Sequence, residues 1–165
     1  MQGNLKKLQE FSKTIPKCEL HLHIEGTLEP ELALELGKKN NIQMKYSTIE
    51  ELRNAYKFKD LQSFLDLYYE GASVLVTSED FEKLAWEYFL KCKRDNVIHA
   101  EIFFDPQTHT KRNIPFSTFM KGFKHAMDRA QVELQISSAL IMCFLRDLSE
   151  EEAFQTLEEA LPYLD

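Results

Sequence analysis

Apolar and polar residues alternate strictly over most of the stretch 18–26. A period of two predicts a β-strand with one set of side chains on each face. The polar face carries His21 and His23, two residues apart and flanked by carboxylates. Gly26 closes the pattern, and Pro30 suits the first turn of a helix that follows.

Two later stretches, 97–105 and 135–145, are largely apolar and predict further strands, of the parallel kind that is buried on both faces. Helical spacing of apolar residues predicts long helices over 61–75, 79–95 and 116–131. Shorter helices are expected at 4–13, at 30–39, after Ser47 or Thr48, each of which has a Glu three residues on, and after Ser149. A loop is expected over 107–114, and Ser78 is expected to be an N-cap. Strands alternating with helices predict one α/β domain over 1–165, built of right-handed parallel βα units.

Charge and composition narrow the range of partners. The 165 residues carry a formal net charge of −7, so binding to nucleic acid is not favoured. Three widely separated cysteines, with no Cys-x-x-Cys, fit a reducing compartment. Neither a signal peptide nor an apolar run long enough to span a membrane is recognised, so we expect a cytoplasmic protein without a membrane partner.

The His-x-His pair on the first strand is a candidate metal site. Residues i and i+2 lie on one face about 7 Å apart, so both imidazoles can turn onto one ion, with Zn–N bonds of about 2 Å. The spacing alone leaves a second interpretation equally open, in which the pair lies on a solvent-facing strand.

The run from Pro16 to Leu28, which contains His-Leu-His-Ile-Glu-Gly, resembles the opening strand of the adenosine deaminase family. The similarity continues over 61–65, 100–107 and 144–151. Glu25 stands where adenosine deaminases usually carry an Asp, and Phe103 where they usually carry an Arg. The sequence is therefore most similar to the adenine deaminase branch.

The resemblance implies roles for individual residues. His21 and His23 would be the first two ligands of one Zn²⁺ per active site. Glu25 and Gly26 would lie beside the substrate. The residues that would form an apolar lid over the purine are Leu61, Phe64 and Leu65. Core packing remains an interpretation of that stripe as well, since one helix can do both.

The family fold is a TIM barrel, which needs eight strands and about 250 residues. The chain supplies three strands, so we expect a partial (β/α)8 barrel with additional helices after the first strand. The family's later zinc ligands and its His-Ala-x-Glu motif have no match here, so no catalytic residue is assigned. We interpret His99 as a packed strand residue, His109 as a loop residue, and His125 as part of a helix.

The implied activity of the complete enzyme is zinc-dependent hydrolysis of a 6-aminopurine, adenine or adenosine, to the 6-oxopurine and ammonia, in purine salvage. Zinc would lower the pKa of its bound water toward 7. Glu19 would orient a ligand histidine or be a surface carboxylate. The isolated chain is expected to be inactive and to bind zinc weakly.

Three other functions were weighed. A cytidine-deaminase-like site is excluded because it needs Pro-Cys-x-x-Cys. A His-x-His metallophosphoesterase and a non-catalytic half-barrel folding or assembly module both remain open. Unpaired strand edges and an uncovered apolar face also predict self-association of the chain.

Overall fold

The computed structural model describes residues 2–164 and contains a three-stranded parallel sheet in the order β1-β2-β3. The strands are β1 (Lys17–His23), β2 (Val97–Phe104) and β3 (Ser137–Met142). His23 is paired with Phe103, and Phe103 with Ile141, so these side chains share one face. The sheet does not close on itself, which confirms the predicted partial barrel.

Two strands are shorter than predicted. The first ends at His23, where the chain turns into the 3-10 helix η1 (Ile24–Thr27) because Ile24 and Glu25 are drawn into the interior. The third begins two residues late, because the preceding helix continues as a π-helical turn, η2 (Ala130–Leu134). Gln135 then reverses the chain with a φ of 60°.

The described residues form eight α-helices. They are α1 (Gln2–Thr14), α2 (Pro30–Lys39), α3 (Ile49–Ala55), α4 (Leu61–Ser73), α5 (Ser78–Arg94), α6 (Pro106–Thr110), α7 (Phe116–Arg129) and α8 (Glu150–Ala160), with the 3-10 turn η3 (Leu161–Tyr163) after α8. Of the two candidate caps Ser47 and Thr48, Thr48 forms the capping box, and the predicted capping box at Ser149 is confirmed. The N-cap of α5 is Thr77 and not Ser78, and α6 occupies part of the stretch predicted as a loop.

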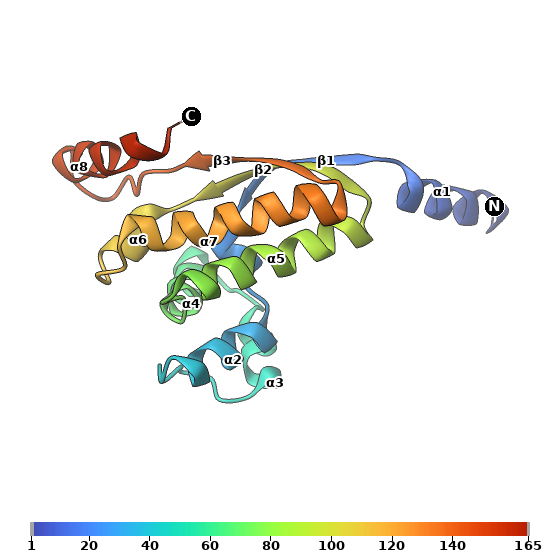
Figure 1. Cartoon of the computed structure of the whole chain (residues 1–165). Coiled ribbons are helices and arrows are strands. Elements are labelled where there is room, and N and C mark those ends of the chain that lie inside the picture. Colours follow the sequence, from blue (N-terminus) through green and yellow to red (C-terminus); the bar gives the residue numbers. More distant parts are fainter. Residues whose placement is uncertain (1, 165) are drawn as a thin grey trace.

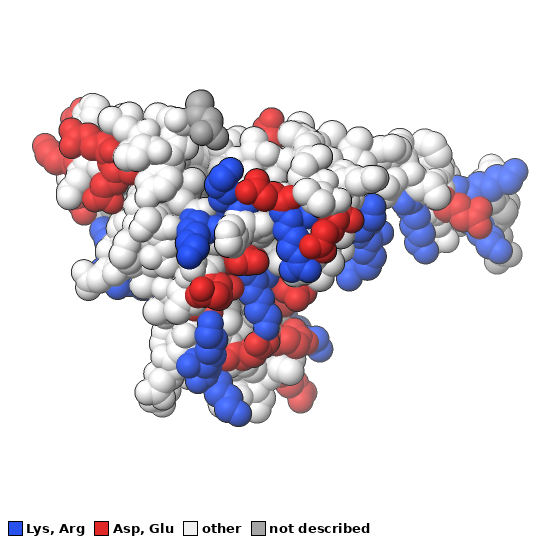
Figure 2. Space-filling model, viewed as in Figure 1, with Lys and Arg blue, Asp and Glu red and all other residues white. Residues whose placement is uncertain are grey.

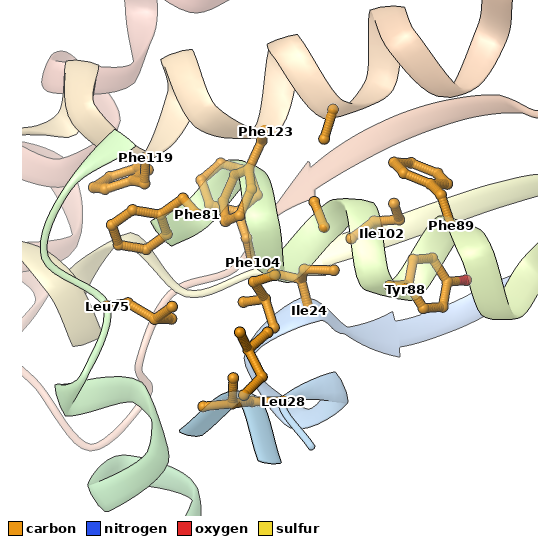
Figure 3. Packing of buried hydrophobic residues seen from close by; sticks show 14 of the residues in the cluster. Ile24, Leu28, Leu75, Phe81, Tyr88, Phe89, Ile102, Phe104, Phe119 and Phe123 are labelled. Atoms are coloured by element: carbon orange, nitrogen blue, oxygen red, sulfur yellow. The ribbon is translucent and has the colours of Figure 1, made fainter. Parts of the chain in front are cut away.

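Helices α5 and α7 lie side by side beneath the sheet and cover one of its faces (Figure 1). Aromatic rings meet β2 there: Phe119 and Phe123 of α7 contact Phe104, and Phe81 of α5 packs against both of them (Figure 3). The two helices approach closely at Gly122, where an added Cβ would lie 2.3 Å from the Ser78 carbonyl oxygen. This layer is the core that holds the strands in place.

The other face of the sheet is not covered by any described element (Figure 1). Along β2 the residues Ala100, Ile102 and Phe104 are buried, while the alternate positions are only half-buried. The apolar character of this strand suits burial on both faces, but parallel strands need a layer on each side for that, and the described residues supply one layer. The uncovered face that three strands alone predict is therefore present in the described chain.

The two ends of the described chain extend beyond the sheet (Figure 1). Leu5, Leu8 and Phe11 of α1 are each more than 60% exposed, so α1 does not cover the sheet. Acidic side chains gather over α8, whereas charges of both signs are interspersed over α5 and α7 (Figure 2). Over residues 2–164, no helix combines the length and the apolar character that crossing a bilayer requires.

Candidate metal and substrate site

His21 and His23 lie on the open face of the sheet, at the end of β1. The Phe103 ring of the neighbouring strand is close to both, with centroid separations of 4.7 Å from His21 and 5.5 Å from His23. The two imidazole centroids are 6.2 Å apart. The strand alternation thus brings both rings to one side, as the sequence predicts, and leaves them accessible.

A cavity of about 590 Å³ opens in front of these rings, at the carboxyl ends of the strands. Its wall is formed by β1, by β2, by α4 and by the loop after β3. The lining residues are His21, His23, Phe64, Leu65, Tyr68, Tyr69, Phe103, Asp105, Cys143, Phe144, Leu145, Arg146 and Asp147. This end of the strands is where enzymes of the barrel fold carry their active sites.

The structure brings four of the seven predicted site residues together: His21, His23, Phe64 and Leu65 line the cavity. Glu25 and Gly26 line a small neighbouring recess of about 30 Å³, which also touches Phe64. Leu61 is 71% exposed at the first position of α4 and lines neither space.

The remaining histidines and Glu19 lie away from the cavity. His99 is half-buried on the open face, where its Nδ1 is 2.7 Å from the Ser137 hydroxyl oxygen. His125 is exposed on α7, 3.4 Å from Glu82. Glu19 is exposed, and no hydrogen bond joins it to His21 or His23 in the described chain. His109 is not in a loop: it is fully buried in α6.

Asp105 is the partner of His23. Its Oδ2 lies 3.2 Å from Nδ1 of His23, so the imidazole donates from Nδ1 and keeps Nε2 free. Burial and the nearby charge of Glu25 raise the pKa of Asp105, although hydrogen bonds from Tyr68 and His23 oppose this. Asp105 therefore orients His23, which is the task that the sequence suggested for Glu19.

Glu25 is buried behind Tyr68 and faces three donors, of which the Tyr68 hydroxyl shares its single proton with Asp105. Its Oε1 accepts from the Asp105 backbone N–H at 3.0 Å and from His109 at 2.9 Å. Its Oε2 faces the Tyr68 hydroxyl at 3.1 Å. Burial alone would raise the pKa of Glu25, but the His109 and Asp105 hydrogen bonds outweigh it and the pKa lies below its usual value. Glu25 thus has a complete set of partners inside the protein.

Tyr68 stands between Glu25 and the cavity. Its hydroxyl donates to Oδ2 of Asp105 at 2.6 Å. Burial, with the charges of Glu25 and Asp105, raises the pKa of Tyr68 far above its usual value. The side chain therefore stays a neutral hydrogen-bond donor at the cavity wall at physiological pH.

Metal-ligating groups meet beside His23. One ligand atom each from His23, Asp105 and Cys143 can be chosen so that all three lie within 4.8 Å of one another. Nitrogen, oxygen and sulfur donors are those that zinc accepts. Burial and the charges of Asp105 and Glu25 raise the pKa of the Cys143 thiol. The donor chemistry of the site therefore fits a zinc ion.

The sequence predictions missed Tyr68, Asp105 and Cys143 as site residues. A signal existed for Asp105, since it directly follows a strand and precedes Pro106. Tyr68 was grouped with the apolar stripe of α4, and nothing local marks its hydroxyl. Cys143 directly follows β3 but is a single cysteine without a motif.

Residues 16–165 match the family model described as adenosine deaminase. A curated adenine deaminase of Psychrobacter cryohalolentis is 61% identical over 94% of this chain and 47% of the relative. One of Trichlorobacter lovleyi is 59% identical over 96% of this chain and 45% of the relative. The chain thus spans about half the length of the curated relatives it matches.

Two solved structures are likewise similar to most of this chain over less than half of their own length. The crystal structure of adenine deaminase from Arthrobacter aurescens superposes with a TM-score of 0.86 at 45% identity, covering 90% of this chain and 45% of that one. An amidohydrolase from Burkholderia ambifaria, solved with bound Zn, has a TM-score of 0.82 at 22% identity, covering 93% of this chain and 42% of that one. The second likeness concerns the fold alone.

Proposed function

Because this chain belongs to the adenosine deaminase family, we propose that the complete enzyme hydrolyses the 6-amino group of adenine and releases ammonia. The identity of 61% and 59% to two adenine deaminases supports adenine as the substrate. The chain spans about half of those relatives, so the activity is proposed for the whole protein. We place the reaction in purine salvage in the cytoplasm.

The observation that carries this proposal is the meeting of two imidazoles with an aromatic wall in one cavity. His21 and His23 share the space of about 590 Å³ with Phe64, Tyr69 and Phe103. Such a volume accepts a small ligand, and flat rings stack well on a flat purine. An accessible imidazole pair beside this wall would bring a metal-activated group close to the base.

His21 and His23 would hold the zinc ion, which when bound supplies an activated water. Asp105 accepts the Nδ1 proton of His23 and so presents Nε2 as the metal-binding atom. Cys143 lies close enough to be a further donor. On the opposite wall, Phe64 and Leu65 of α4 exclude water from the base.

We propose that the 165-residue chain alone does not deaminate adenine. Proton transfer to the leaving amine needs a positioned acid, and the family's His-Ala-x-Glu motif is not found in the sequence. The buried Glu25 already accepts hydrogen bonds from the Asp105 backbone N–H and from His109, so it does not take that role.

A fusion protein tests the proposal. Residues 1–165 replace the matching part of the Psychrobacter cryohalolentis adenine deaminase, and ammonia release is measured with zinc from adenine and adenosine. We expect release from adenine, which His21→Gln and His23→Gln abolish. The matched control His125→Gln, exposed on α7, keeps full activity. An inactive fusion beside an active parent, or activity with adenosine only, would contradict the proposal.

The same fusion protein distinguishes adenine deamination from the metallophosphoesterase alternative. That enzyme would release phosphate from sugar phosphates. Two carboxylates, Asp105 and Asp147, line the cavity together with one guanidinium, Arg146, and this balance disfavours a phosphate group.

A further inference from the structure

Arg112 is anchored in the interior just after α6. Its Nε donates to the Thr108 carbonyl at 3.1 Å, its Nη1 to the Ser73 carbonyl at 2.9 Å, and its Nη2 to the Leu75 carbonyl at 3.1 Å. Ser73 and Leu75 lie at the end of α4 and just beyond it. The guanidinium is therefore held by two separate parts of the backbone, and one of them is the helix that forms a cavity wall.

The anchored guanidinium determines the tautomer of His109. Nη2 of Arg112 is 3.0 Å from Nδ1 of His109. Arginine can only donate, so Nδ1 must be unprotonated and accept. The proton of the neutral ring is then on Nε2, which donates to Oε1 of Glu25 at 2.9 Å. If both ring nitrogens were protonated, the Nδ1–H of His109 and an Nη2–H of Arg112 would point at each other with no acceptor between them.

Packing holds the His109 ring in this orientation. The side chain is fully buried. The Phe81 ring meets it edge-on at 4.8 Å, and the Phe119 ring is tilted at 5.4 Å. Rotation of the imidazole would break both hydrogen bonds inside an apolar shell and leave buried polar groups without partners.

The hydrogen-bond chain ends at the cavity. Glu25, held by His109 through Oε1, presents Oε2 to the Tyr68 hydroxyl at 3.1 Å. The single proton of that hydroxyl is shared with Asp105, whose Oδ2 is the nearer acceptor at 2.6 Å, and Asp105 contacts His23. Tyr68 and Asp105 both line the cavity.

We propose that Arg112 and His109 are positioning residues, which hold the Glu25 carboxylate in one orientation and through it set the Tyr68 hydroxyl at the cavity wall. Neither residue touches the cavity itself. The inference deepens the proposed function, because it concerns the wall of the same site. The competing explanation is that His109 only fills space between Phe81 and Phe119.

The first test measures the tautomer directly in the 165-residue chain. Long-range ¹H–¹⁵N correlation spectra distinguish protonated from unprotonated ring nitrogens, and His109→Gln identifies the signal among five histidines. We expect a neutral His109 protonated on Nε2. In Arg112→Lys the signal should change, whereas in Arg53→Lys, an exposed control, it should not. A wild-type ring protonated on Nδ1, or on both nitrogens, overturns the proposal.

The second test compares His109→Phe with His109→Gln. Phenylalanine keeps the aromatic packing but has no donor for Glu25, whereas glutamine keeps an N–H donor but loses the ring. The readout is the ¹³C shift of the Tyr68 Cζ, which senses the hydrogen bonds of the hydroxyl, in chain labelled at its six tyrosines. Tyr68→Phe assigns the signal, and Tyr88 on α5 is the internal reference.

Positioning predicts that the Tyr68 signal moves in His109→Phe and stays in His109→Gln. Space-filling predicts the reverse, and that result overturns the proposal. If His109→Phe does not fold, the wild-type tautomer and the Arg112→Lys spectrum still decide. Neither readout uses metal or substrate, so a failed deamination assay leaves this inference standing, and a wrong tautomer leaves the deamination proposal standing.

Discussion

The two faces of the sheet differ in what their residues do, although they share one backbone. On the covered face, Ala100, Ile102 and Phe104 of β2 are buried against α5 and α7. On the open face, Phe103 is only half-buried and lies beside the accessible imidazoles of His21 and His23. One face therefore provides stability, and the other carries the groups that suit chemistry.

The comparison shows how strand alternation separates these tasks. Successive side chains point to opposite faces, so a residue can change on one side without disturbing the other. The separation is not complete, because a series of hydrogen bonds runs from Arg112 through His109 and Glu25 to Tyr68, and so connects the helical layer to the cavity. Mutations of the core should then act on stability, and those of the open face on ligand binding.

The largest effect is expected for Phe81→Ala, compared with Phe103→Ala. Phe81 is fully buried among Phe119, Phe123 and His109, so its truncation should cost about 3–5 kcal/mol of unfolding free energy. Phe103→Ala on the open face should cost roughly 1 kcal/mol. Urea unfolding followed by circular dichroism measures both, and Phe81→Leu is the milder step if alanine prevents folding. Equal losses would contradict the division between the faces.

Gly122→Ala should destabilise the protein by about 3 kcal/mol, at the upper end for overpacking. The new Cβ would meet the Ser78 carbonyl oxygen at 2.3 Å and the Glu82 amide nitrogen at 2.8 Å, so α7 must move away from α5. Gly26→Ala is the matched control, because its Cβ would be 3.8 Å from Tyr68. A Gly122→Ala melting temperature equal to that of Gly26→Ala would show that the two helices are not in tight contact.

Asp80→Asn should cost about 2 kcal/mol at pH 7, since Asp80 is buried and accepts charge-assisted hydrogen bonds. Its partners include Lys39 at 2.5 Å and Thr77 N–H at 2.9 Å. Burial raises the pKa of Asp80, but the Lys39 and Thr77 hydrogen bonds outweigh it, so the folded-state pKa lies below its usual value.

This lowered pKa has a definite sign for stability. The stabilisation by Asp80 is fully present above the unfolded-state pKa of about 3.9 and is lost as the pH falls through the lower folded-state pKa. The difference between wild type and Asp80→Asn should therefore shrink below about pH 4. Unfolding curves at several pH values measure it, with the exposed Asp128→Asn as control. If the stability difference grew in acid, the folded-state pKa of Asp80 would lie above its usual value and not below it.

Zinc should have a smaller effect, raising the unfolding free energy by less than about 1 kcal/mol at a zinc concentration near its dissociation constant. Two imidazoles are half of a tetrahedral set, so binding to the 165-residue chain is expected to be weak. His21→Ala and His23→Ala should remove the effect. Chelator-resistant, stoichiometric zinc would mean that more ligands are present, and Cys143→Ser would then test the thiol.

Self-association through the open face remains a prediction, with the weakest expected effect. Apolar residues there, such as Phe103 and Ile141, stand among polar ones, such as His99 and Glu101, whereas Glu19 pairs with Ala100 of the covered face. We expect a concentration-dependent dimer in sedimentation equilibrium. A monomer at all micromolar concentrations would show that the open face does not drive association.

The sequence by itself determined the βα order, the parallel sheet, the capping box at Ser149, and the placement of His21 and His23 on one face. These depend on local periodicity and on short-range hydrogen bonds, which a single stretch of chain contains. Phe64 and Leu65, which the periodicity of α4 and the family resemblance both mark, line the cavity, and their role as a lid over the purine remains a prediction.

Only the tertiary structure decided which distant groups meet. Tyr68, Asp105 and Cys143 come from α4 and from the ends of two strands, and no local pattern links them to His23. The same holds for His109, which the sequence placed in a loop and the structure buries against Glu25, 84 residues away. A buried polar group must find a partner wherever packing provides one, so such pairs follow from the fold and not from spacing along the chain.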